Sequence, residues 1–331
     1  MSEPYRLRWF EDGDLETYIS GLNENLYDLY DEHRFKWKFI ENPCNLGFVS
    51  IAVAEAPGGK PVAFNSFLPL RVRVGNEVLI VVEGCDGFVS RGHRGAGLFQ
   101  ETLKFMAREL KGRGPEFLMG FNFAGSAGAA RKAGSAVSCN VQRWRAKPEE
   151  ISKQKLGIGD ISVKPAGVDK VQALCKEWAS SNSKLHVLRS SEYLRWRFLG
   201  SPRRSFKLFA IEDGGEEGYV AVSTDTDGHG SLELSIDDYT PMISREPVAS
   251  AVLGHILHLY PNLSEVSALT PSGSALGSTL SGLGFSPDPD VSFSMIIKAI
   301  EDLEAEGNNL YRKGLELTDI GNWYITGSDV F

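Results

Sequence analysis

The segment "FVSRGHRGAGLFQETLK" (Phe88–Lys104) decides the fold. A short apolar run ends at Val89, and glycines follow at positions 92, 95 and 97. Apolar residues then recur at helical spacing, at Leu98, Phe99, Leu103, Met106 and Leu110. This order predicts a strand, a glycine-rich turn and an amphipathic helix.

The glycine-rich turn has the properties of an anion site. A turn that opens a helix leaves backbone N–H groups unpaired where the helix dipole favours negative charge. Glycine lets a bulky phosphate approach the backbone, and Arg94, with Arg91 or His93, adds positive charge. The spacing GxxGxG differs from the dinucleotide pattern GxGxxG and from a Walker A loop. A phosphate cradle and a plain strand–helix connection both remain open at this point.

Composition limits the classes of protein. The chain has 331 residues, enough for two domains, with 42% hydrophobic residues and a net charge of −8. Nucleic-acid surfaces are basic, so we expect no nucleic-acid partner. The longest strongly apolar run, Val78 to Val82, is too short to span a membrane. No signal-peptide pattern is present and the four cysteines are widely spaced, so we expect a cytoplasmic protein with reduced thiols, either a monomer or a homodimer.

A second feature is an internal repeat. The segment "RFKWKFIENP" (Arg34–Pro43) is echoed by "YLRWRFLGSP" (Tyr193–Pro202). Each copy is followed by an alternating strand, a Gly-Gly turn and a second strand. We therefore predict two copies of one α/β unit, in residues 1–150 and 151–331, joined around Ala146–Asp160. We expect Trp37 and Trp196, at the centre of the motif, to be core anchors.

The two copies diverge at the glycine-rich turn. The second copy reads "SLELSIDDYTPMISREP" (Ser231–Pro247) before a helix predicted from about Val248 to Tyr260. No glycine separates that strand from that helix. Since the unit can be built without the loop, a ligand explains the loop better than folding does.

The loop resembles motif A of the GNAT superfamily of acyl-CoA-dependent N-acyltransferases. Val89 matches the valine near the strand end, Arg94 the arginine and Gly97 the central glycine, whereas Phe99 replaces the last Gly or Ala. The segment "FLMGFNFAGSAGAARKAGS" (Phe117–Ser135) is similar to the next motif, a strand followed by Asn and a short helix. The resemblance implies two tandem GNAT-like domains, each a mixed, mostly antiparallel sheet flanked by helices. The second domain would be a degenerate copy without the pyrophosphate loop.

The resemblance also implies acetyl-CoA as the co-substrate, without a metal. The strand end would offer backbone groups to the pantetheine arm and to the thioester oxygen. The turn would hold the pyrophosphate. The cofactor-binding residues carried over in this way are Phe88, Val89, Ser90, Arg94, Gly95, Ala96, Gly97, Leu98, Phe99, Asn122 and Ser126.

The reaction also needs a base. A lysine-like amine has a pKa of about 10.4, so making it neutral at pH 7 costs roughly 4–5 kcal/mol. Asp86 stands where many GNAT sequences carry a glutamate, so it is the first candidate, and Glu83 is the second. The usual tyrosine acid is missing, because Ala130 occupies its position in the first copy and Leu280 in the second. Another residue or water would have to protonate the thiolate.

Three functions fit these residues. The first is an N-acetyltransferase that acts on a primary amine of a small molecule, such as an amino acid, an amino sugar or a polyamine. The second is a non-catalytic acyl-CoA-binding sensor or scaffold, which the missing tyrosine favours. The third is a Fem-type aminoacyl transferase, against which the acidic charge and the intact loop argue.

Overall fold

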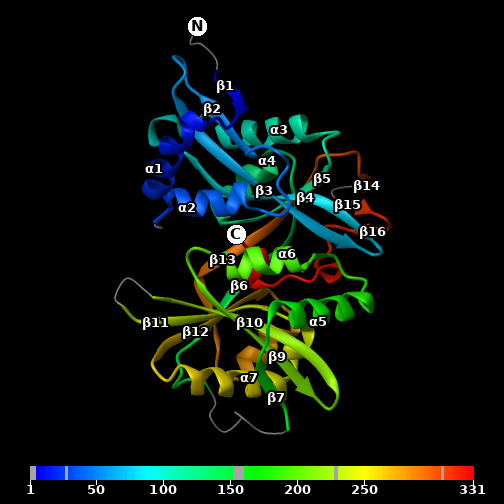
Figure 1. Ribbon diagram of the computed structural model, residues 1–331. Coiled ribbons are helices and arrows are strands. Elements are labelled where there is room, and N and C mark those ends of the chain that lie inside the picture. Colours follow the sequence, from blue (N-terminus) through cyan, green and yellow to red (C-terminus); the bar gives the residue numbers. More distant parts are fainter. Residues whose placement is uncertain (1–4, 27–28, 152–159, 227–229, 307–308) are drawn as a thin grey trace.

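The computed structural model describes residues 5–26, 29–151, 160–226, 230–306 and 309–331. The two halves of the chain lie one above the other, and the C-terminal segment runs between them (Figure 1). Most of the predicted linker falls on residues 152–159, which lie outside the described residues.

The first half carries the predicted strand–turn–helix in the middle of a longer series. Its strands are β1 (Arg6–Trp9), β2 (Ile51–Glu55), β3 (Pro61–Val74), β4 (Glu77–Val89), β5 (Pro115–Asn122) and β6 (Ala136–Ala146). Its helices are α1 (Leu15–Asn25), α2 (Glu32–Phe35), which continues as a π-helical turn (Lys36–Ile40), α3 (Leu98–Leu110) and α4 (Ala124–Lys132).

The second half repeats this order. Its strands are β7 (Ser162–Pro165), β8 (His186–Val187), β9 (Ser205–Asp213), β10 (Glu216–Thr226), β11 (Leu232–Tyr239), β12 (Leu263–Pro271) and β13 (Ser286–Ala299). Its helices are α5 (Val168–Ser180), α6 (Ser191–Leu194), which continues as a π-helical turn (Arg195–Leu199), α7 (Glu246–Leu259) and α8 (Ala275–Gly282). A small sheet of β14 (Glu304–Glu306), β15 (Asn309–Arg312) and β16 (Leu315–Glu316) follows.

One sheet of 13 strands, counted over the described ranges, runs through both halves. Its order is β1-β2-β3-β4-β5-β13-β6-β12-β11-β10-β9-β7, with β8 beside β3. The pairs β4–β5 and β11–β12 are parallel, and the other pairs are antiparallel. The order reads alike from either edge when corresponding strands are exchanged. A mixed, mostly antiparallel sheet flanked by helices confirms the predicted fold class.

The two halves exchange their last strands. β13 lies between β5 and β6, and β6 pairs in turn with β12. The neighbours of β5 are thus β4 and a strand from the other end of the chain. Because backbone N–H and C=O groups need partners when buried, each half satisfies its sheet only with a strand from the other. The boundary between residues 150 and 151 stays a prediction.

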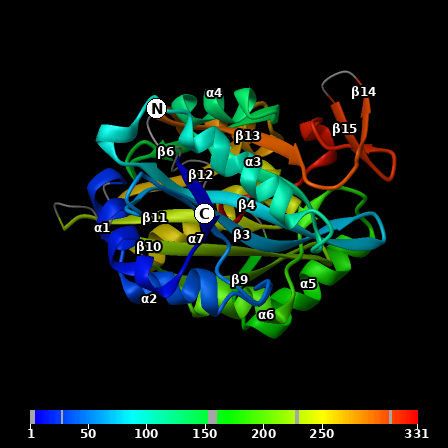
Figure 2. The ribbon, with the colours of Figure 1, turned by 90° about the horizontal axis from the view of Figure 1, so that it is seen from above.

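Strand alternation sorts the side chains of the first half into two layers. In β4, Val81 belongs to the large core that also holds Tyr18 and Leu22 of α1. Val82 belongs to the core under α3, with Leu103. Seen from above, α3 and α4 lie on one side of the strands and α2 on the other (Figure 2). After the glycine-rich turn, α3 therefore packs on the face of the sheet opposite to the face that α1 covers.

Trp37 and Trp196 join the two copies. In each π-helical turn the last amide bonds to the carbonyl five residues back: Glu41 to Lys36, and Gly200 to Arg195. The next carbonyl loses its usual partner and is open to accept.

The two tryptophans use these open carbonyls reciprocally. The Trp37 indole donates to the Trp196 carbonyl (2.8 Å), and the Trp196 indole donates to the Trp37 carbonyl (2.7 Å). The rings stack with centroids 5.0 Å apart. The predicted core anchors thus form an interface around a local pseudo-twofold axis.

The four cysteines are free thiols at positions 44, 85, 139 and 175. Burial raises the pKa of Cys175 to about 12 and that of Cys139 to about 11, which lowers their reactivity. Within the described ranges, no helix has both the length and the apolar character to cross a membrane.

The tryptophan pair predicts a stability hierarchy. Trp196→Ala removes the stack and the bond that the Trp196 indole donates to the Trp37 carbonyl, and should lower the free energy of unfolding by about 3–5 kcal/mol. Trp196→Phe keeps most of the stack but leaves the buried Trp37 carbonyl without its donor, a loss of roughly 1–3 kcal/mol. Leu199→Ala, in the same turn but 60% exposed, is the control, with a change within about 0.5 kcal/mol. Urea unfolding followed by circular dichroism measures all three, and equal midpoints would show that the pair does not hold the copies together.

Candidate functional site

The first cavity opens where β4 and β5 part. Their parallel pairing ends at Gly84 and Gly120. β4 continues through a bulge in which Asp86 and Gly87 stand opposite Asn65 of β3. A cavity of about 410 Å³ lies between the separated ends. Its lining includes Gly84, Cys85, Asp86, Gly87, Phe99, Leu103, Phe121, Asn122, Phe123 and Ser126.

The glycine-rich turn lies at the end of β4 and opens α3 directly. Gly95 (φ +85°) and Gly97 (φ +76°) adopt the left-handed conformation that favours glycine. A Cβ at Gly95 would meet no atom within 4 Å, so the space above the turn is open. Gly95 and Ala96 are exposed, Leu98 is buried, and Phe99 reaches the cavity. The turn thus presents backbone to open space beside the cavity, as an anion site requires.

Arg94 is held at the strand end. Its Nε donates to the carbonyl of Val89 (3.1 Å), and its Nη2 donates to Oδ1 of Asn25 (2.6 Å). The amide of Ser90 donates to Val62 of β3 (2.8 Å) and is therefore already engaged. Val89, one residue earlier, turns its carbonyl away from β3. Phe88 was predicted to bind the cofactor, but its ring stacks on Phe64 and does not line the cavity.

Asp86 forms a buried ion pair with Lys38. The two atoms Nζ and Oδ2 are 2.7 Å apart, and the side chains are 2% and 8% exposed. Burial acts to raise the pKa of Asp86, but the charges of Lys38 and Arg34 outweigh it and hold the pKa below its usual value. Asp86 also has φ +34°, a strained angle for a residue with a side chain. An ionised, strained carboxylate at the cavity wall is a functional candidate.

Glu83, the second candidate base, is deeper. It is 1% exposed and does not line either of the two cavities described here. Its Oε1 accepts from the amide of Phe331 (3.1 Å), and its Oε2 has no partner in the described part of the chain. Burial raises the pKa of Glu83 well above its usual value. Burial therefore favours the neutral form of this carboxyl.

Sequence reasoning missed Tyr30. Its ring lines the first cavity, and its buried hydroxyl has no hydrogen-bond partner among the residues described. Burial and the charge of Asp86 raise the pKa of this hydroxyl, so it stays a neutral donor. Ala130, where a tyrosine was expected from the resemblance, lies fully buried under α3. Tyr30 comes from the segment between α1 and α2, which no motif marks.

A second cavity of about 460 Å³ adjoins the first. Both are lined by Arg34, Phe293, Val330 and Phe331. The second lies where β11 and β12 part after Ile236 and Ala268, the equivalent place in the other copy. Its β11 also carries a bulge, at Asp237. The repeat thus produces two adjoining cavities, one from each strand pair.

The second copy lacks the phosphate loop in three dimensions as well. A short 3-10 turn (Pro241–Ser244) replaces it, and Met242 and Ile243 are buried there. The following helix α7 carries Glu246 in its first turn. A negative side chain at a helix N-terminus takes the place that an anionic ligand would occupy.

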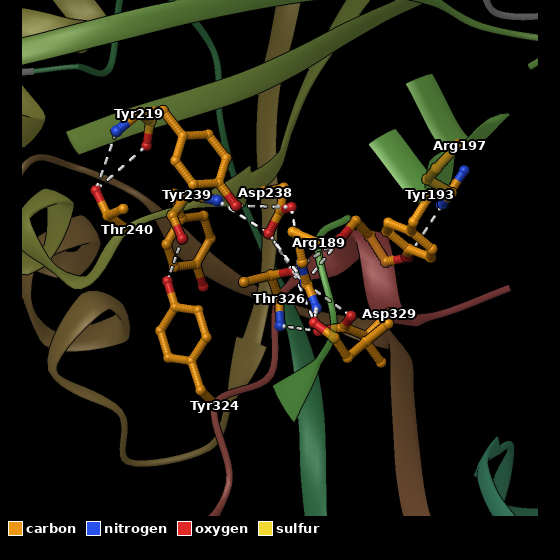
Figure 3. A network of polar contacts seen from close by, with 12 residues as sticks. Arg189, Tyr193, Arg197, Tyr219, Asp238, Tyr239, Thr240, Tyr324, Thr326 and Asp329 are labelled. Atoms are coloured by element: carbon orange, nitrogen blue, oxygen red, sulfur yellow. Dashed lines mark hydrogen bonds and ion pairs between the residues drawn. The ribbon is translucent and has the colours of Figure 1, made fainter. Parts of the chain in front are cut away.

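A buried polar network holds the C-terminal segment against β11 (Figure 3). Arg189 pairs with Asp238 (3.1 Å) and Asp329 (2.7 Å) and donates to the hydroxyl of Thr326 (2.9 Å). Burial raises the pKa of Asp329, although the charge of Arg189 offsets part of this rise. The network fixes the short turn Gly327–Asp329, and Phe331 then reaches the boundary between the cavities.

The described residues hold no cluster of three or more His, Cys, Asp or Glu that could bind a metal. His255 and His258 lie on α7, one turn apart, in the second copy.

Comparisons with known proteins agree with this geometry. No protein-family model and no curated protein matches the sequence. Among solved structures, a GCN5-related N-acetyltransferase from Anabaena variabilis aligns with a TM-score of 0.66 at 13% identity, over 90% of this chain and 73% of that one. N-myristoyltransferase from Saccharomyces cerevisiae, solved with bound myristoyl-CoA, gives 0.60 at 14% identity, over 90% and 84%. A probable N-acyltransferase from Enterococcus faecalis gives 0.62 at 11%, over 90% and 72%. The chain therefore has the GNAT fold, as the loop predicted.

The Lys38–Asp86 pair predicts a reversal of pH dependence. In the wild type, the lowered pKa of Asp86 stabilises the fold above the unfolded value of about 3.9, and this stabilisation is lost as pH falls through the folded pKa. In Lys38→Met, Asp86 loses its ion-pair partner while Arg34 remains, so burial outweighs the remaining charge and raises the pKa of Asp86, and stability falls as pH rises above about 4. We expect a loss of about 3–5 kcal/mol at pH 8.

Urea unfolding at pH 5 and pH 8 measures this effect. The double variant Lys38→Met/Asp86→Asn removes both charges and should recover most of the loss. A Lys38→Met variant with the wild-type pH profile would contradict the ion pair.

Proposed function

We propose that the protein is an acyl-CoA-dependent N-acyltransferase that transfers an acetyl group from acetyl-CoA to a primary amine of a small molecule. The observation that carries the proposal is the placement of the glycine-rich turn. It opens α3 beside the cavity that begins where β4 and β5 part. A long thioester with an anionic head needs both features, a phosphate site and an adjoining slot.

The turn supplies the phosphate site in this proposal. The backbone from Arg94 to Phe99 binds the pyrophosphate of CoA, and the α3 dipole stabilises its negative charge. Arg94, held by Val89 and Asn25, keeps its positive charge at the same place. The pantetheine arm then runs into the first cavity between β4 and β5, past Asn122 and Ser126.

The β4 bulge places the thioester. The amine nitrogen attacks the thioester carbon, the carbonyl oxygen becomes an oxyanion, and the C–S bond then breaks to release CoA thiolate. Backbone N–H groups that face the slot stabilise the oxyanion, because they are fixed before the reaction begins. The bulge frees Asp86 and Gly87 from regular pairing with β3, so this part of β4 can serve the ligand.

Asp86 accepts the proton of the attacking amine, directly or through water. Lys38 keeps it ionised, so it also attracts the ammonium form of the acceptor. Glu83 is buried without lining the first cavity, and its raised pKa favours the neutral form, so it is the weaker candidate. Tyr30 also lines this cavity, and its neutral hydroxyl is the candidate donor to the departing sulfur. A thiol with a pKa of about 8.5 needs little further help near neutral pH.

An acyl-CoA-binding sensor is the second candidate. Ala130 favours it, because this buried methyl group cannot protonate a leaving thiolate. Turnover separates the two functions. An enzyme releases CoA from acetyl-CoA in the presence of an amine, whereas a sensor binds acetyl-CoA with no amine-dependent release.

Gly97 tests the phosphate site. Any side chain is strained at its φ of +76°, and Asn and Asp tolerate this angle best. Gly97→Asn and Gly97→Asp have nearly equal shapes and differ by one negative charge. We expect Gly97→Asp to bind acetyl-CoA at least tenfold more weakly than Gly97→Asn, because the carboxylate repels the pyrophosphate. Calorimetric titration with acetyl-CoA measures both, and equal affinities would move the pyrophosphate away from this turn.

Variants of Asp86 and Glu83 test which of these two carboxyl groups is the base. Asp86→Asn should lower kcat by about 100-fold or more, with little change in acetyl-CoA affinity. Glu83→Gln keeps the shape of a side chain that does not line the first cavity, so its kcat should change by less than about fivefold. The double variant Lys38→Met/Asp86→Asn controls for the unpaired lysine and should stay slow. A fast Asp86→Asn enzyme beside a slow Glu83→Gln enzyme would reverse the assignment.

A further inference from the structure

Arg197 is a buried cation that lines the second cavity. Its relative exposure is 8%. Its Nε donates to the carbonyl of Ser328 (3.1 Å), and its guanidinium lies over the ring of Phe331, 4.4 Å from the centroid. Within the described ranges, no carboxylate lies within ion-pair distance of it. Asp237 and Glu83 interact with its charge only from beyond that distance. A buried charge without a close counter-ion is costly unless a ligand supplies one.

The repeat explains why Arg197 lacks a partner. Arg197 occupies the position of Lys38 in the other copy, and Lys38 pairs with the bulge aspartate Asp86. The corresponding bulge aspartate, Asp237, is already bound. It accepts from Arg204 (3.1 Å) and from the hydroxyl of Ser223 (2.6 Å). The second copy has therefore kept the cation and directed its expected counter-ion elsewhere.

The surroundings of Arg197 are basic. Six cationic side chains line the second cavity, at Arg34, Lys38, Arg143, Arg197, Arg203 and Arg204. Three acidic side chains line it, at Asp225, Glu233 and Asp237. The whole chain has a net charge of −8, whereas more cationic than acidic side chains line this cavity. Lys38, Arg143, Arg203 and Arg204 each pair with a carboxylate. The attraction for an anionic group is therefore assigned to Arg197, for which the described residues provide no ion pair.

The backbone around Arg197 is fixed in advance. The Arg189 network holds the turn that carries Ser328. Tyr193 of α6 and Arg197 of the following π-helical turn both bond to the Ser328 carbonyl (Figure 3). The Nε bond to Ser328 sets the plane of the guanidinium and leaves its two Nη atoms for another partner. Two parallel N–H donors match the two oxygens of a carboxylate.

We propose that the acceptor amine also carries a carboxylate, and that Arg197 binds it in the second cavity. The inference rests on the proposed function, since it names the acceptor class for that site. The two cavities meet at Arg34, Phe293, Val330 and Phe331. A molecule anchored at Arg197 can therefore extend its amine toward Asp86. Amino acids and short peptides fit this description, whereas polyamines and neutral amino sugars lack the carboxylate.

Matched pairs of small molecules test the carboxylate directly. Lysine and cadaverine, tyrosine and tyramine, histidine and histamine, and tryptophan and tryptamine differ by one carboxylate within each pair. Calorimetric titration into the CoA-saturated protein gives the affinity of each. We expect the amino acid of at least one pair to bind tenfold or more tightly than its decarboxylated partner. The absence of such a preference in every pair, including the absence of any binding, overturns the inference.

Variants of Arg197 assign the effect to this residue. Arg197→Gln should remove the preference, and Arg197→Lys should keep part of it because the charge remains. Arg195→Gln is the control, because Arg195 lies in the same turn, is exposed and pairs with Asp169 at the surface. A preference that persists in Arg197→Gln overturns the role of Arg197. If that variant does not fold by circular dichroism, Arg197→Lys and the wild-type pairs still decide.

The proposed function is tested separately. Titration with acetyl-CoA alone, without any amine, reports on the first cavity. If the wild-type protein does not bind acetyl-CoA, the proposed acyltransferase function is contradicted. Normal acetyl-CoA binding without a carboxylate preference contradicts only the inference about the acceptor.

Discussion

The reciprocal bonds between Trp37 and Trp196 are the interaction on which the rest of the structure depends. Each indole satisfies the carbonyl that the other's π-helical turn leaves open, so neither turn is complete alone. The contact sets the two copies about a local twofold axis, and the exchange of β6 and β13 fixes the same relation within the sheet. In this arrangement, the cavity where β4 and β5 part adjoins the cavity where β11 and β12 part. The boundary between their cavities then becomes a place where a donor and an acceptor can meet.

The two copies differ in the connection between the strand and the helix that follows it. The first copy has the glycine-rich turn, with Gly97 in a left-handed conformation and open space above it. The second copy fills the same place with buried Met242 and Ile243, followed by Glu246 at the helix start. Such packing stabilises the fold and excludes an anion there. One cavity therefore lies beside the glycine-rich turn, which we propose as the phosphate site, whereas the other is lined by several basic side chains.

The features predicted correctly from the sequence are those that depend on short local patterns. The glycines and apolar spacing after Val89 identified the strand, turn and helix, and the repeated tryptophan motif identified the duplication. The exchange of β6 and β13 could not be predicted, because both orders of strands satisfy the same hydrophobic alternation. Tyr30 and Lys38 were missed for a related reason. They reach Asp86 from a segment about 50 residues earlier, and only tertiary packing brings them together. Asp86 itself was named from a motif, but its bulge and its ion pair belong to the three-dimensional structure.

The C-terminal segment links the chemistry of the two cavities. Arg189 holds its short turn by pairing with Asp238 and Asp329, and hydrogen bonds from Arg189 to Thr326 and Ser328 tie the same turn to this network. From that turn, the Ser328 carbonyl orients Arg197 in one cavity. Three residues later, the Phe331 amide binds Glu83 beneath the other. Because both contacts come from residues 328–331, a shift of this segment would move Arg197 and Glu83 together. The second copy, although it lacks the phosphate loop, thereby sets the geometry in which the first copy works.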